Sequence, residues 1–241
     1  MKKVLLLTTL LFLPLCLMGQ KSKVSKPTGT VKGYGYVDLG LSVKWATHNI
    51  GAETPEEFGD YYAWGEIRTK NKYDWQTYKF AIIPDPRFLD GFSKYDVKFP
   101  EGRLFIIKSE ALNLETKLES TDDAAHQIWG GSWRMPTHDE WLELKKKCLW
   151  IWTSINGHSG YRIISKKNGK SIFLPASGHI HSTFDDNNNS FGECGYYWSS
   201  SIGVINTGFP SEASAVFFIR DHVSDIGFDR DLGLSIRPVT L

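Results

Sequence analysis

The sequence predicts an α+β protein in which a few short helices pack on short antiparallel strands joined by long loops. Short runs of β-forming residues bounded by Gly, Pro, Asn or Asp recur along most of the chain, whereas helix-start chemistry with helical spacing is confined to a few segments. The 28 Lys and Arg residues are balanced by 27 Asp and Glu residues, so the broad positive field that attracts nucleic acid or an anionic membrane is missing. We expect no nucleic-acid partner, and a partner that is neutral or locally matched in charge.

The N-terminus carries two lysines followed by an apolar run at residues 4–17, which is too short to span a bilayer as a mature helix. This pattern is typical of a secretory signal peptide, and the small Gly19 favours cleavage after it, so residues 1–19 are expected to be removed. The alternative is a lipoprotein with a lipid anchor at Cys16, although the bulky Leu15 stands where such signals prefer a small residue. We expect an exported protein that is secreted, periplasmic or on the outer-membrane surface.

No second long apolar run follows, so the sequence predicts no transmembrane span in the mature chain. Residues 20–33 are polar and contain Gly and Pro, which favours a flexible leader. Neither a linker nor an internal repeat divides the remainder, so residues 34–241 are expected to form a single domain.

The first elements are short and β-rich. Strands are predicted at residues 36–39, 43–47 and 61–64. Between them, Thr54 as a cap, Pro at the first helical position and Glu at the third predict a short helix at 54–57. The fifty or so residues that follow contain several Pro and Gly and predict a long irregular excursion.

The strongest helix signal stands in the middle of the chain. Acidic residues in a first turn and a closing Gly predict a short helix within residues 121–129. Thr137 and Glu140 then form the pattern of a capping box, in which each side chain accepts a backbone N–H of the other's residue. Trp141 and Cys148 share the buried face of the helix that follows, which is expected to end near Cys148.

The second half of the chain predicts antiparallel strands. Residues 161–165 and 171–174 flank Asn168-Gly169, a dipeptide that supplies the positive φ angles of a hairpin loop. Further strands are predicted at residues 196–200, 213–219, 224–228 and 234–239. Cys148 and Cys194 are the cysteines left after cleavage; either they form a disulfide or they remain free thiols, and no Cys-x-x-Cys indicates a redox site.

Three motifs occur in order in this chain: Gly-Ser-Trp-Arg-Met-Pro-Thr at 131–137, Tyr-Tyr-Trp-Ser-Ser-Ser at 196–201 and Ser-Ile-Arg-Pro-Val at 235–239. They resemble the Fibrobacter succinogenes major paralogous domain family, whose proteins are exported, and the resemblance covers roughly residues 34–239. That family is distantly similar to C-type-lectin-like domains, a group that includes the formylglycine-generating enzymes. The resemblance implies a C-type-lectin-like fold with a compact core and a binding surface on its late loops. It implies scaffold roles for Trp133, Arg134, Pro136, Thr137, Glu140, Trp141 and Arg237.

The late loops contain the residues that the sequence offers for ligand binding. Charged residues alternate between the last predicted strands, with an aromatic among them, and such a mixture suits sugars, carboxylates or protein surfaces. The alternative is a set of soluble hairpin turns whose ion pairs contribute little. Trp198 is either a core residue or an exposed aromatic platform. The ligand-binding residues that we predict are Trp198, Arg220, His222, Asp225, Phe228 and Arg230.

Two histidines form the strongest metal pattern. His179 and His181 are two residues apart, so on a strand they project from one face and reach the same ion, with Asp185 close by in sequence. The alternative is a pair of exposed strand histidines. Residues 185–189 supply oxygen ligands that calcium accepts, but their spacing differs from that of an EF-hand, so a solvated turn is favoured over a calcium site.

These observations favour a non-enzymatic, exported binding module that recognises a glycan or a surface protein through its C-terminal loops. The alternative is a structural subunit of a surface assembly or an adhesin. A metal-dependent enzyme ranks third, because no catalytic constellation stands in the sequence and the copper-thiolate chemistry of formylglycine generation needs two neighbouring cysteines. We therefore expect no cofactor, with calcium or a transition metal as the alternative.

Overall fold

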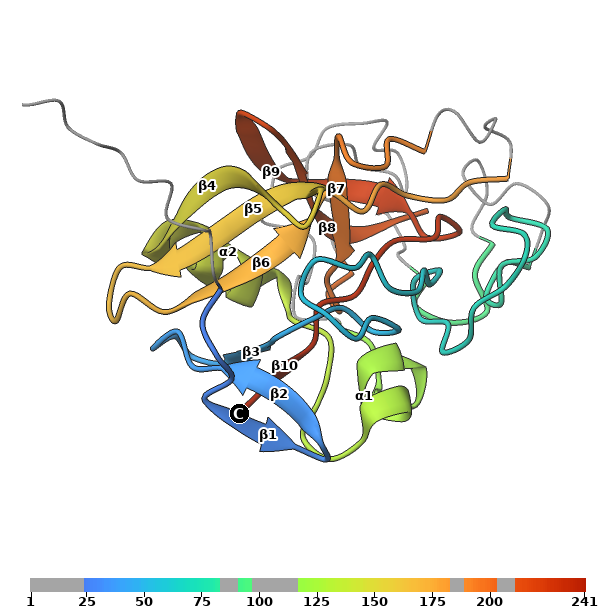
Figure 1. Cartoon of the computed structure of the whole chain (residues 1–241). Helices are drawn as coiled ribbons and strands as arrows, with labels where there is room; N and C mark the ends of the chain where they lie inside the picture. Colours follow the sequence, from blue (N-terminus) through green and yellow to red (C-terminus); the bar gives the residue numbers. More distant parts are fainter. Residues whose placement is uncertain (1–23, 83–90, 97–116, 183–188, 203–210) are drawn as a thin grey trace, which may run out of the picture.

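The computed structural model describes residues 24–82, 91–96, 117–182, 189–202 and 211–241. Within them, the chain forms three antiparallel sheets and two short α-helices (Figure 1). The elements are β1 (Gly29–Val31), β2 (Tyr34–Val37), β3 (Lys44–Ala46), α1 (Ala124–Trp129), α2 (His138–Lys147), β4 (Cys148–Ile155), β5 (His158–Ser165), β6 (Ser171–Pro175), β7 (Gly195–Trp198), β8 (Glu212–Ile219), β9 (His222–Asp229) and β10 (Val239–Thr240). The architecture is thus rich in antiparallel sheet with few helices, as the sequence predicts.

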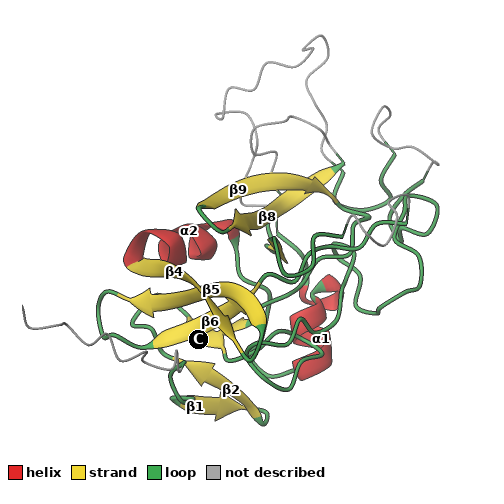
Figure 2. Ribbon diagram, turned by 45° about the horizontal axis from the view of Figure 1, so that its top comes forward, coloured by secondary structure: helices red, strands yellow, loops and turns green. Residues whose placement is uncertain are grey.

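The three sheets differ in how their strands are connected. The first has the order β1-β2-β3-β10, so the beginning and the end of the described chain meet in one sheet. The second, β4-β5-β6, and the third, β7-β8-β9, are built from strands that follow one another in sequence. Figure 2 shows α2 against the second sheet and α1 on the opposite side of the molecule. Neither helix is long and apolar enough to cross a bilayer.

The core lies where the inner faces of the sheets meet α2. Trp45 of β3, Trp141 of α2 and Tyr197 of β7 are fully buried there, and the Trp45 and Trp141 rings lie 4.6 Å apart. A second cluster under α1 contains Trp64, Trp133 and Trp198. Close packing of so many aromatic rings explains how a chain with few helices buries a large apolar surface.

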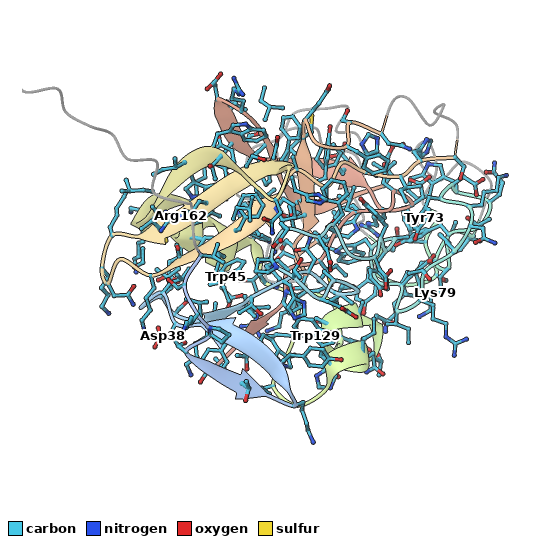
Figure 3. All side chains as sticks on the ribbon, in the orientation of Figure 1. Asp38, Trp45, Tyr73, Lys79, Trp129 and Arg162 are labelled. Carbon is cyan, nitrogen blue, oxygen red and sulfur yellow. The ribbon has the colours of Figure 1, made fainter. Side chains whose placement is uncertain are left out.

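The long excursion after Trp64 has its own small core. Tyr73, Trp75, Tyr78, Phe80 and Phe92 are buried against one another with few regular elements around them. Figure 3 labels Tyr73 and Lys79 at this end of the molecule. The rest of the predicted excursion, residues 83–90 and 97–116, lies outside the described residues.

Several elements follow the local chemistry of the sequence. The predicted capping box is present, because the Thr137 hydroxyl accepts from Glu140 N and the Glu140 carboxylate accepts from Thr137 N. The Asn-Gly hairpin joins β5 to β6, and Gly169 has a φ of +71°, the left-handed conformation that glycine adopts at little cost. Strands β7, β8 and β9 lie within about two residues of their predicted bounds.

Other predictions are wrong in detail. The leader is ordered from residue 24, because β1 pairs with β2 and Thr28 N donates to Tyr36 O at 2.7 Å. Residues 54–57 form a turn, since the chain reverses so that Asp60 N donates to Ile50 O. The strand predicted at 61–64 is reduced to a single bridge between Tyr62 and Leu234. Residues 1–23 lie outside the described part of the chain.

Strand β4 is absent from the predictions. The run Cys148–Ile155 is nearly continuous in apolar residues, and such a run directly after a helix has no alternation that separates strand from helix. Its pairing with β5, from Cys148 opposite Ser165 to Ile155 opposite His158, supplies the hydrogen bonds that make it a strand.

Candidate ligand-binding face

Three aromatic side chains gather at one end of a face of the β7-β8-β9 sheet whose other end, at Trp198 and Ala215, is covered by the second core cluster. Tyr196 of β7 lies opposite Phe217 of β8 in register, with ring centroids 5.0 Å apart, and Phe228 of β9 lies 5.1 Å from Tyr196. All three are half-buried, whereas Tyr197 and Phe218, one residue further along their strands, are fully buried. We call Tyr196, Phe217 and Phe228 the aromatic face.

His179 borders the aromatic face. Its ring centroid lies 4.8 Å from that of Tyr196. The chain is held there by backbone pairing, because Ile180 and Gly233 exchange two hydrogen bonds of 2.9 Å and Gly178 bridges Gly195. Tyr196 thus has two neighbours that the sequence singled out: His179, predicted to bind a metal, and Phe228, predicted to bind a ligand.

The two predicted metal histidines have different surroundings. His181 Nε2 lies 3.6 Å from Asp231 Oδ2, and the Asp231 side chain is 1% exposed. The pKa of His179 is lowered by burial and by the neighbouring charge of His181, which favours a neutral ring at pH 7. In the described part of the chain, no group of three or more His, Cys, Asp or Glu is arranged to hold a metal ion. The third predicted ligand, Asp185, lies outside that part.

The β8–β9 hairpin carries predicted charged residues at its tip. Arg220 and His222 are exposed there, and the Tyr161 hydroxyl is within hydrogen-bond distance of Ile219 O and of Arg220 O, at 3.1 and 2.6 Å. A buried tyrosine beneath the turn therefore supports the tip. Asp225 is directed to the other side of the hairpin, where Lys145 of α2 forms an ion pair with it at 3.3 Å.

Two predicted ligand residues are buried, and their assignment to a binding surface is wrong. Trp198 is fully buried and donates from Nε1 to Tyr62 O at 2.7 Å, so it belongs to the core, the alternative that the sequence left open. Arg230 is also fully buried, and its Nη1 donates to Tyr95 O at 2.9 Å. Segments distant in sequence pack over both residues, with Tyr62 accepting from Trp198 and Tyr95 accepting from Arg230.

The buried Arg230 lies between aromatic rings. Its guanidinium carbon is 4.6 Å from the centroid of Phe92 and 5.2 Å from that of Trp64, and Nε donates to Glu212 O at 3.2 Å. Planar stacking of a guanidinium on aromatic faces stabilises the charge where water is excluded. Arg230 therefore connects the third sheet to the aromatic excursion.

The residues to which the family resemblance assigns scaffold roles form hydrogen bonds within the core. Trp133 Nε1 donates to Val31 O at 2.9 Å, and Pro136 O accepts from Ser200 N at 2.8 Å. Arg237 is fully buried, donates from Nε to Asn49 Oδ1 at 2.8 Å and from Nη1 to Ala46 O at 3.2 Å, and burial lowers its pKa to about 10.

Both described cysteines are free thiols, so of the two alternatives the disulfide is absent. Cys148 is buried at the end of α2, where burial raises its pKa to about 11. Cys194 is half-buried just before β7. The Cys148 thiol is therefore almost entirely protonated at neutral pH and is a poor nucleophile or metal ligand.

Sequence reasoning missed Tyr196, Phe217 and Asp231. The alternation in β8 contains a signal for Phe217, because it falls on the opposite face from Val216 and Phe218. Asp231 has no such signal, since its proximity to His181 depends on the pairing of Ile180 with Gly233.

No family model, no curated protein and no solved structure matches this chain. The fold and the site together define the chain as a protein rich in antiparallel sheet, with two short described α-helices and a half-buried aromatic face on its third sheet.

Proposed function

We propose that this chain is a non-enzymatic binding module that recognises a glycan at the cell surface through the aromatic face. The observation that carries the proposal is the arrangement of the half-buried rings of Tyr196, Phe217 and Phe228 beside one another on a sheet. Flat apolar rings with a polar edge match the C–H face of a sugar ring, and strand pairing holds them in place before binding. The nearly balanced charge of the chain favours a neutral ligand of this kind.

Polar groups around the aromatic face orient the bound glycan. His179 offers a ring that is polar but neutral, and Arg220 and His222 lie further along the same hairpin in solvent. Such groups donate to and accept from sugar hydroxyls without the desolvation cost of a buried charge. The resemblance to the Fibrobacter succinogenes domain family and to C-type-lectin-like domains supports a binding rather than a catalytic role.

The test is retention on a glycan array, with Tyr196→Ala and Phe217→Ala as the variants. Each variant is expected to weaken retention at least about tenfold, the effect of removing a central aromatic contact. Phe191→Ala is the matched control, because Phe191 is 44% exposed and belongs to a different aromatic cluster. Unchanged retention in the two variants, with an unchanged melting temperature, would exclude the aromatic face as the site.

A second function, a structural subunit or adhesin that binds a surface protein, is favoured by a different observation. Phe58 and Phe191 stack with centroids 6.0 Å apart, and an exposed apolar ring of this kind suits a protein partner. Under this proposal, a protein partner co-purifies with the chain in the absence of glycan retention, and Phe191→Ala abolishes that co-purification.

We also propose that the protein is exported, as its N-terminal charge and apolar run indicate. Intact-mass measurement of the native protein tests this directly. A mass that corresponds to residues 20–241 supports signal-peptide cleavage after Gly19, and an acylated product that begins at Cys16 supports a lipid anchor.

A further inference from the structure

Lysines gather at one end of the β4-β5-β6 sheet. The end of α2 carries Lys146 and Lys147, and the turn between β5 and β6 carries Lys166, Lys167 and Lys170. Hydrogen bonds bring the two segments together, because Lys166 N donates to Lys147 O at 3.2 Å and Lys166 Nζ donates to Lys146 O at 3.0 Å. We call these five residues the lysine end.

The lysine end has an excess of positive charge. Glu143 forms an ion pair with Lys147 at 2.7 Å, and the carboxylate of Asp38 accepts from Gly40 N at 2.7 Å. Among the described residues, no carboxylate forms an ion pair with Lys146, Lys166, Lys167 or Lys170. In a chain with a formal net charge of only +1, this is a local feature of one surface.

Aliphatic side chains adjoin the lysine end on the outer face of the same sheet. Leu149 and Ile151 of β4 are 51% and 49% exposed, whereas Trp150 between them turns inward and packs against the core. Across the sheet, Leu149 pairs with Ile164 and Ile151 pairs with Arg162, which Figure 3 labels on this sheet. Leu149 and Ile151 are exposed neighbours beside lysines that form no ion pair in the described part of the chain. Such a surface indicates that a partner covers it when the protein functions.

The described chain also begins at this sheet. Ser25 N donates to Ser171 O at 3.1 Å and Ser25 Oγ accepts from Ser171 N at 2.8 Å, so residues 24–26 lie along the open edge of β6, next to Lys170. Figure 1 shows this segment beside β6.

We propose that the lysine end, together with Leu149 and Ile151, docks on an anionic phospholipid membrane. The lysine ammonium groups bind the headgroup phosphates, and the two aliphatic side chains enter the interface between headgroups and acyl chains. A second copy of this chain is disfavoured as the occupant, because it would place like charges against one another. The aromatic face belongs to a different sheet, so docking and ligand binding are separate properties.

The test is co-sedimentation of residues 20–241, which contain every described element, with vesicles of phosphatidylglycerol and phosphatidylcholine at low salt. Binding is expected to require phosphatidylglycerol and to weaken strongly in high salt. Replacement of Lys146, Lys166 and Lys167 by Gln is expected to weaken binding by roughly a hundredfold, at about fivefold per lysine. Leu149→Ser combined with Ile151→Ser is expected to weaken it by about tenfold.

The matched control replaces three exposed cations elsewhere, Lys32, Arg68 and Lys117, by Gln. This control changes the net charge equally and is expected to retain binding to within about threefold. Equal binding to pure phosphatidylcholine, or equal losses in the control and the lysine variant, would overturn the proposal. A dimer that is lost in the Leu149/Ile151 variant, without any vesicle binding, would also overturn it and assign the surface to self-association.

Discussion

Arg134 and Glu140 are joined by two parallel hydrogen bonds at the start of α2, with Arg134 Nη1 2.8 Å from Glu140 Oε2. The same Oε2 accepts from Thr137 N at 2.8 Å and closes the capping box. Arg134 is itself bridged to Val239 of β10 through its backbone. The Glu140 carboxylate therefore connects the start of α2, through Arg134, to β10 at the C-terminal end of the chain.

Glu140→Ala is expected to lower the free energy of unfolding by about 2 kcal/mol, because it removes both a cap and a charge-assisted pair. Thr137→Ala removes only the cap hydroxyl and is expected to cost about 1 kcal/mol. Urea unfolding measures both, with Asp139→Asn as the exposed first-turn control, expected to change stability by a few tenths of a kcal/mol. Equal stability of the Glu140→Ala variant and the parent would contradict this role.

Asn49→Leu is expected to lower the free energy of unfolding by about 3 kcal/mol. It leaves the buried Arg237 guanidinium without its side-chain acceptor and removes a donor from Phe58 O. In the double variant Asn49→Leu/Arg237→Met the buried charge is gone, so the loss is expected to be smaller than the sum of the single losses by at least about 1 kcal/mol. A double-mutant cycle by urea unfolding measures this coupling, and strict additivity would show that Asn49 does not compensate the charge.

Stability is expected to decrease as the pH falls below about 6.5. Burial lowers the pKa values of His48 and His179 from 6.5 in the folded protein. The unfolded chain therefore binds protons that the folded chain does not, so stability is complete above pH 6.5 and is lost as the pH falls toward the lowered values. Urea midpoints at about pH 7.5 and about pH 5.5 measure the loss. His48→Gln/His179→Gln is expected to reduce this dependence, with a remainder from His138, whose pKa burial also lowers. An unchanged slope would rule out His48 and His179 as a source.

The two thiols are expected to react at different rates with Ellman's reagent. Burial raises the pKa of Cys148 to about 11, so only about a thousandth of this thiol is ionised near pH 8. The half-buried Cys194 is expected to react first, and Cys148 only after unfolding. Cys148→Ala removes the slow phase and serves as the control. A denatured sample without titratable thiol would instead indicate a disulfide.

Local chemistry made part of the fold predictable. The entrance of α2 depends on residues three apart in sequence, Thr137 and Glu140, and the β5–β6 hairpin depends on Asn168 and Gly169. Such signals are independent of what packs nearby. The helix predicted at 54–57 shows the limit, because the same local pattern yields a turn where the chain must reverse to reach Ile50.

The candidate site was predictable only in part. Phe228, His179 and His181 stood out from the sequence, but Tyr196, the common neighbour of Phe228 and His179, did not. Trp198 and Arg230 have the residue types of a binding surface, yet other segments cover them.

The sequence by itself determined a fold rich in antiparallel strands with few helices, the start of α2, the β5–β6 hairpin and the balanced charge, because each follows from neighbouring residues or from composition. Only the tertiary structure decided which residues on the late strands reach solvent and which histidine lies beside which ring. The physical reason is that a strand's periodicity assigns its side chains to two faces, whereas burial depends on distant segments such as those that pack over Trp198 and Arg230.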